Sequence, residues 1–105
     1  MTVHPAVVLA RLAHLGRLLD QLEKLRAVPR SERDPIHELA AERALHVSAE
    51  AVFDIGHHVL AGRGLRVPAT YREVIPALVA AGVLEASLGK RLDGMAGMRN
   101  ILVHD

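Results

Sequence analysis

The chain of 105 residues contains no cysteine and no tryptophan, and it has only one tyrosine and one phenylalanine. Without cysteine it can form no disulfide and no thiolate site, a composition that suits a cytoplasmic protein. Residues that favour strands are scarce while leucine and alanine are abundant, so the composition predicts an all-helical fold. The length suits one domain with a single core, which we assign to residues 1–105.

Long apolar runs and a strong net charge are also absent. No stretch approaches the roughly 18 apolar residues of a membrane span, and the N-terminus lacks a signal-peptide pattern, so we expect a soluble protein that is not exported. The net charge is +1, so any contact with nucleic acid must be local. The sequence contains no G-x-S-x-G, no glycine-rich phosphate loop and no H-E-x-x-H, which excludes the catalytic classes that these motifs mark.

Hydrophobic periodicity predicts a first helix over residues 5–26, with Pro5 in its first turn. Its apolar stripe, which we expect to form a broad core face, consists of Val8, Leu12, Leu15, Leu19 and Leu22. Residues 27–34 have no periodicity and form a connection. Asp34 and Pro35 then match the N-cap and first position of a second helix, which we expect to reach residue 61 before Gly62 ends it.

Residues 62–69 are predicted to be a loop by their glycines and proline. Thr70 to Glu73 match a capping box at the start of a third helix, which Pro76 should bend or shorten and Gly82 should end. Tyr71, at the start of this helix, is the only tyrosine that could stack on a base, although packing is the more common role there.

A fourth helix is expected from residue 85 to residue 103. It would include three glycines, each of which costs about 1 kcal/mol relative to alanine in a helix interior. We therefore expect another helix to approach closely at Gly94 and Gly97, either within the bundle or across a dimer interface. Together these segments predict an antiparallel, up-and-down bundle of four main helices.

The fourth segment ends in an R-x4-H motif formed by Arg99 and His104. Arg99 occupies a position of the apolar stripe where a charge needs a partner or a function. On an ideal helix the two motif positions differ by about 140° and about 7.5 Å, whereas Asn100 and His104 share a face. A second copy of the helix across a two-fold axis would bring the groups together more easily, which indicates a shared site in a homodimer.

A polar stripe runs along the otherwise apolar second helix. It comprises Arg43, His46, Glu50, Asp54 and His57, and their spacing confines them to about 80° of the helix circumference. Three interpretations are open: a solvated or interfacial seam of paired charges, an acidic surface that places Glu50 and Asp54 against Arg99, or a metal site built from Glu50, Asp54 and His57. The metal interpretation is the weakest, because bundle metal sites draw such pairs from two helices.

Arginine and histidine are suited to RNA cleavage without a metal ion. Attack by the ribose 2′-OH requires removal of its proton, stabilisation of the charged phosphorane and protonation of the leaving 5′-oxygen. Histidine titrates near neutral pH and can move these protons, while arginine can hold phosphate through two parallel hydrogen bonds. Asn100 can orient the imidazole or the ribose.

The segment from Arg99 to His104 resembles the R-x4-6-H signature of the HEPN superfamily of small helical ribonucleases, in particular its HepT-like branch. Residues 41–60 (AERALHVSAEAVFDIGHHVL) and 68–84 (PATYREVIPALVAAGVL) are similar to the family's second and third long helices. The resemblance implies a HEPN-like bundle and an endoribonuclease toxin. It assigns catalysis to Arg99, Asn100 and His104, with support from Glu50 and Asp54, and it implies no cofactor and no metal.

The resemblance also implies a cognate nucleotidyltransferase antitoxin of the MntA type as partner. In the family an H-x-Tyr continuation and usually a further helix follow, and the antitoxin attaches AMP to that tyrosine. The sequence stops at Asp105, so we expect a chain that lacks the family's C-terminal helix and cannot carry this modification. The alternative to the enzyme is a non-catalytic helical module that docks a nucleotidyltransferase through its polar stripe.

Overall fold

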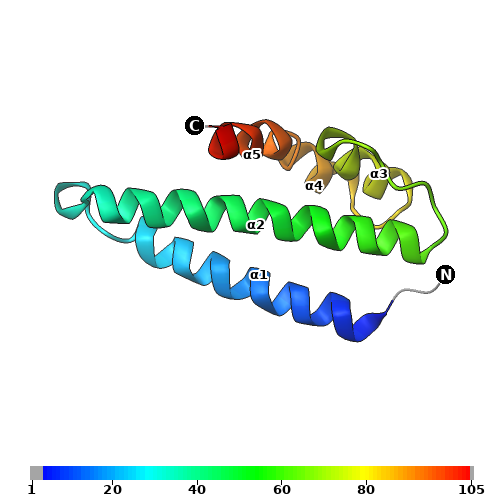
Figure 1. The fold of residues 1–105 in the computed structure, drawn as a ribbon, viewed down its shortest axis with the longest axis horizontal. Coiled ribbons are helices and arrows are strands. Elements are labelled where there is room, and N and C mark those ends of the chain that lie inside the picture. Colours follow the sequence, from blue (N-terminus) through cyan, green and yellow to red (C-terminus); the bar gives the residue numbers. More distant parts are fainter. Residues whose placement is uncertain (1–3, 105) are drawn as a thin grey trace.

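An all-helical chain is organised around one long central helix (Figure 1). The structure, a computed structural model, describes the backbone of residues 4–104 and the side chains of residues 4–101. Its helices are α1 (Pro5–Arg26), α2 (Pro35–Gly62), α3 (Val74–Ala80), α4 (Ala86–Arg91) and α5 (Met95–His104), with 3₁₀ turns η1 (Arg30–Glu32) and η2 (Tyr71–Glu73). Since the described residues include no strand, the predicted all-α class is confirmed. None of these helices has the length and apolar character needed to cross a membrane.

The elements form three layers, with α2 between α1 on one side and α3, α4 and α5 on the other (Figure 1). The molecule measures 49 × 27 × 25 Å and has a radius of gyration of 15.2 Å, larger than the roughly 13 Å of a spherical domain of this length. The elongation arises because the α1–α2 hairpin extends beyond α5 at its closed end. Both outer layers therefore depend on α2 for their position.

The connection between α1 and α2 is closed by local polar contacts. The Arg33 guanidinium donates to two carbonyl groups of the preceding turn, at 2.9 and 3.1 Å. Asp34 caps α2: its carboxylate accepts from the backbone N–H of His37, and its own N–H donates to the His37 ring. The hydrogen bond from His37 lowers the pKa of Asp34. The predicted start of the second helix is thus confirmed, with a capping box that extends to a histidine.

Two predicted helix boundaries need correction. Helix α2 includes Gly62 as its last residue. The chain turns away two residues later at Gly64, whose φ of +70° is the left-handed conformation that glycine tolerates best. Thr70 precedes η2 but makes no side-chain capping bond, so the predicted capping box does not form. The predicted end of the third helix at Gly82 is confirmed by its φ of +75°.

The single fourth helix predicted over residues 85–103 is wrong, because a turn at residues 92–94 divides it into α4 and α5. Gly94 lies in this turn. A Cβ atom added at Gly94 or Gly97 would have no neighbour within 4 Å in the described chain, so close packing within the bundle does not explain these glycines. The close approach is instead at Gly89, where an added Cβ would overlap the Val79 side chain. Close approach at these glycines across a dimer interface stays a prediction.

The hydrophobic core lies between α2 and the C-terminal helices. Its largest fully buried side chains are Phe53, Leu60 and Val74, and they pack with Ala49, Ile75, Leu78 and Ala96. Helix α1 contributes no buried residue, and Leu12 and Leu19 of its stripe are 47% and 48% exposed. The predicted broad core face of the first helix is therefore wrong, because α1 packs mainly along α2 and lies outside the buried cluster. The core instead fixes η2 and α5 against α2.

Candidate functional site

An ion pair joins the arginine of the R-x4-H motif to the central helix. Arg99 of α5 donates from Nε to the Glu50 carboxylate of α2 at 2.6 Å, and the two side chains are 19% and 29% exposed. The hydrogen bond to Glu50 raises the pKa of Arg99 above its already high ordinary value. The charge at an apolar stripe position thus has the partner that its burial requires. The predicted contact between Glu50 and Arg99 is confirmed.

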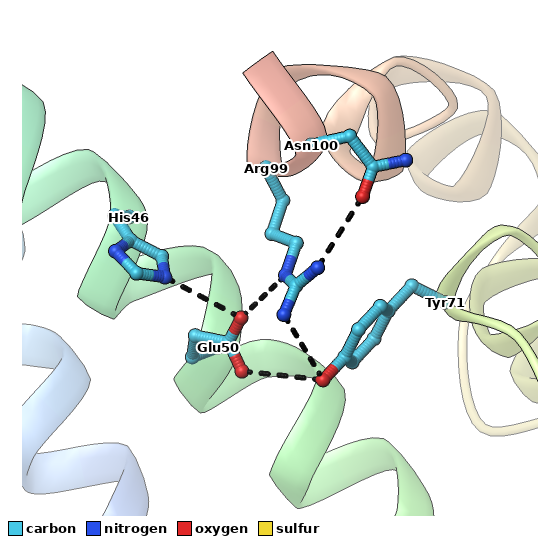
Figure 2. Close-up of polar contacts among 5 residues, drawn as sticks. All are labelled: His46, Glu50, Tyr71, Arg99 and Asn100. Atoms are coloured by element: carbon cyan, nitrogen blue, oxygen red, sulfur yellow. Dashed lines mark hydrogen bonds and ion pairs between the residues drawn. The ribbon is translucent and has the colours of Figure 1, made fainter. Parts of the chain in front are cut away.

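Tyr71 forms the second support of this guanidinium (Figure 2). The Arg99 Cζ atom lies 4.2 Å from the centroid of the Tyr71 ring, within cation–π range. The Tyr71 hydroxyl accepts from Arg99 Nη2 at 3.4 Å and lies 3.5 Å from the second oxygen of Glu50. The ring also packs on the buried Phe53, with 4.8 Å between centroids, and runs nearly parallel to the His57 ring at 6.4 Å. Tyr71 therefore links the site to the core.

Asn100 and His46 complete the network. Arg99 Nη1 donates to the side-chain oxygen of Asn100 at 3.3 Å, and His46 Nε2 lies 3.6 Å from the Glu50 oxygen that binds Arg99. A guanidinium has five N–H donors, and three of them are occupied by Glu50, Asn100 and Tyr71. Among the contacts of the described residues, one N–H is left on each terminal nitrogen. These two donors are suited to the oxygens of a phosphate group.

The other acidic residue of the predicted pair is directed elsewhere. Asp54 lies 3.6 Å from the Arg11 guanidinium of α1, and both side chains are about half exposed. The predicted contact between Asp54 and Arg99 is wrong, because α1 packs along the part of α2 that carries Asp54. Among the residues that the structure describes, no three histidine or acidic side chains lie close enough to hold a metal ion. Glu50, Asp54 and His57 therefore do not converge.

The histidine of the motif is only partly described. His104 is the last residue of α5, and its side chain lies outside the described residues. The structure thus brings Arg99, Asn100 and Glu50 together and does not place the imidazole relative to them. Tyr71 is the residue that the sequence-based site omits, although it occurs as the only tyrosine of the chain, next to a predicted helix start.

Comparison with known proteins gives consistent matches over nearly the whole chain. The profile of the family described as "Ribonuclease HepT-like" matches residues 12–105. The tRNA nuclease HepT of Aphanizomenon flos-aquae (strain 2012/KM1/D3) is 30% identical over 105 residues, which cover 98% of this chain and 71% of that protein.

Two solved structures have the same fold. One, the crystal structure of a toxin-antitoxin with AMP-PNP, matches with a TM-score of 0.85 and 23% identity over 95% of this chain and 76% of that chain. The other, the cytosolic protein of unknown function YutE from Bacillus subtilis, matches with a TM-score of 0.80 and 25% identity over 97% of this chain and 68% of that chain.

Proposed function

This chain belongs to the HepT-like ribonuclease family, and we propose that it is the endoribonuclease toxin of a toxin-antitoxin pair, cleaving RNA without a metal ion. The site that we propose consists of Arg99, Asn100 and His104. The observation that supports it best is the set of contacts of Arg99: Glu50, Tyr71 and Asn100 take three of its five N–H donors, and among the described residues nothing takes the other two, which we assign to a phosphate.

The proposed reaction is an internal transfer at phosphorus. The ribose 2′-oxygen bonds to the phosphorus while the bond to the 5′-oxygen breaks, which leaves a 2′,3′-cyclic phosphate and a 5′-hydroxyl. His104 accepts the proton of the 2′-OH or supplies the proton of the leaving 5′-oxygen, and solvent water makes the other of these two transfers. Arg99 stabilises the phosphorane because its fixed charge faces the oxygens on which negative charge develops.

Glu50 and Tyr71 act as positioning residues in this scheme. They contact Arg99 on the Nε and Nη2 nitrogens, so the guanidinium is oriented before substrate binds and little reorganisation is required. Asn100 accepts from Nη1 of Arg99, so its amide lies beside the position proposed for the phosphate. It is therefore suited to orient the ribose or an imidazole supplied by the partner protomer.

We propose tRNA as the substrate class and a nucleotidyltransferase antitoxin as the partner. The tRNA assignment follows the name of the Aphanizomenon relative, which is a tRNA nuclease. The partner assignment follows the HepT-like family and the likeness in fold to a protein solved as a toxin-antitoxin. Both assignments carry a property of the family or of a relative over to this chain.

An RNA cleavage assay in EDTA tests the proposal. Wild-type protein should release 2′,3′-cyclic phosphate ends from tRNA and should leave DNA intact, since DNA lacks the 2′-OH. His104→Ala should lower the rate by roughly 10²- to 10⁴-fold, the range of general acid-base catalysis. Equal cleavage by wild type and His104→Ala would contradict the mechanism, and no cleavage by either would favour a non-catalytic docking module.

The proposed enzyme is a homodimer whose composite site takes Arg99 from one protomer and His104 from its partner. Mixing an Arg99→Lys protein with a His104→Ala protein tests this arrangement. In a heterodimer one of the two composite sites regains both native residues. Heterodimers form half of a random mixture, so about a quarter of the wild-type activity should return. If each site lies within one protomer, the mixture should be as inactive as its components.

A further inference from the structure

A depression beside the Arg99 network continues the proposed site along the surface. It has a volume of about 430 Å³ and is lined by Thr70, Tyr71, Arg72, Ala96 and Asn100. Two of these residues, Tyr71 and Asn100, are hydrogen-bonded to the Arg99 guanidinium. The depression is therefore adjacent to the position that we assign to the scissile phosphate.

The polar groups in this depression are suited to bind a nucleotide. Arg72 is exposed, and within the described part of the chain no carboxylate lies within 4.0 Å of it. The Thr70 hydroxyl makes no capping bond with η2. Figure 2 shows the amide nitrogen of Asn100 directed away from Arg99, while its oxygen accepts from that residue. The depression thus offers one cation, a hydroxyl and an amide donor.

The balance of charge distinguishes this depression from others on the surface. Depressions near the α1–α2 loop and beside α4 contain cations too, but each also has an acidic side chain in its lining, Glu38 in one and Asp93 in the other. Among the described residues, the lining beside Arg99 includes no carboxylate. Because Glu50 already balances the charge of Arg99, Arg72 supplies the uncompensated positive charge that an RNA backbone requires.

We propose that this depression binds the nucleotide next to the scissile bond, with Arg72 on the flanking phosphate and with Thr70 and Asn100 on the ribose. The inference rests on the proposed ribonuclease function. It makes Arg72 a binding residue, whose loss should weaken the affinity for RNA and leave the rate at saturating substrate unchanged. Such a contact adds no sequence specificity, because phosphate is the same at every nucleotide.

The test uses a 2′-O-methyl oligonucleotide of about eight residues, which spans more than the single phosphate of the site and cannot be cleaved because its nucleophile is blocked. Its dissociation constant is measured by fluorescence anisotropy over a range of salt concentrations for the wild type, Arg72→Gln and Arg17→Gln. Arg17 is an exposed residue of α1, and α1 and α5 lie on opposite sides of α2 (Figure 1). Its substitution removes the same charge without touching the depression.

Arg72→Gln should weaken binding roughly tenfold, as expected for one charge-assisted hydrogen bond. The slope of log affinity against log salt should fall by about 0.7, the value for one contact with a single-stranded phosphate. Arg17→Gln should leave both quantities near those of the wild type. Thr70→Val, which removes only the hydroxyl, should weaken binding without changing the salt slope.

Several results would overturn the inference while leaving the ribonuclease proposal intact. One is equal weakening by Arg72→Gln and Arg17→Gln, which indicates a general charge effect. Another is a lower cleavage rate for Arg72→Gln at saturating RNA, which makes Arg72 part of the catalytic machinery. A third is an Arg72→Gln protein that cleaves RNA and binds the oligonucleotide as well as the wild type does. Arg72 would then have no role in RNA binding, and the depression would be a candidate contact for a protein partner. If the wild type neither binds nor cleaves RNA, the ribonuclease proposal fails and this inference fails with it.

Discussion

Replacing Arg99 by lysine keeps the charge of the site and changes only the geometry of its donors. Arginine has five N–H donors, of which three contact Glu50, Tyr71 and Asn100. The lysine ammonium has three donors, so pairing with Glu50 and Tyr71 would leave one for the phosphate where arginine has two. The transition state would lose one charge-assisted hydrogen bond, which corresponds to a roughly 10- to 150-fold lower kcat/KM.

The assay measures kcat/KM on RNA for the wild type, Arg99→Lys and the distant control Arg17→Lys, with thermal unfolding to confirm that each protein is folded. Tyr71→Phe adds a second variant, since it keeps the ring beside the guanidinium and removes only the hydroxyl contact. We expect its activity to lie between those of the wild type and Arg99→Lys. A folded Arg99→Lys protein with wild-type kcat/KM would refute the argument from donor geometry.

Three further predictions concern the packing of α4, the two acidic residues of α2 and the N-cap of α2. Gly89→Ala should lower the free energy of unfolding by about 1–3 kcal/mol because its Cβ would overlap a neighbouring side chain, whereas Gly16→Ala in α1, with no neighbour within 4 Å of its Cβ, should raise it by about 0.4–1 kcal/mol in chemical denaturation. Asp54→Ala should leave cleavage unchanged and Glu50→Ala should lower it, since Glu50 alone of this pair contacts the site. The folded state lowers the pKa of Asp34, so its stabilising contribution is present above the unfolded value of about 3.9 and is lost as pH falls through the folded value. Between pH 7 and strongly acidic pH, the melting temperature of the wild type should therefore fall more than that of Asp34→Asn.

The helix boundaries that the sequence predicts correctly depend on chemistry within a few residues. Asp34 and Pro35 mark the start of α2 because a carboxylate cap and a proline need only their immediate neighbours. The break between α4 and α5 does not follow from such signals, since a glycine costs only about 1 kcal/mol in a helix. Gly89 packs closely against the Val79 side chain of α3, and no local pattern encodes that contact.

The site was predictable to the extent that burial requires compensation. A charge at position 99 of an apolar stripe needs a counter-charge, and the polar stripe of α2 supplied two acidic candidates. Glu50 and Asp54 differ by only about 40° around an ideal helix, so periodicity does not separate them. The neighbouring elements do, because α5 packs beside Glu50 and α1 beside Asp54. Tyr71 reaches the site only because the loop before α3 returns to α2. The spacing of residues in the sequence does not predict the course of that loop.

The ion pair between Arg99 and Glu50 removes one of the two reasons for proposing a shared site in a dimer. A largely buried Arg99 is one reason to expect a second chain, but Glu50 and Tyr71 of the same chain satisfy its charge and donors. What remains is helix geometry: positions 99 and 104 differ by about 140° on an ideal helix, and Arg99 is directed toward α2. An imidazole on the same helix therefore has little access to a phosphate held by that arginine. A shared site is therefore proposed from the direction of position 104 alone. Mixing the Arg99→Lys and His104→Ala proteins tests whether His104 acts at the site of the other protomer.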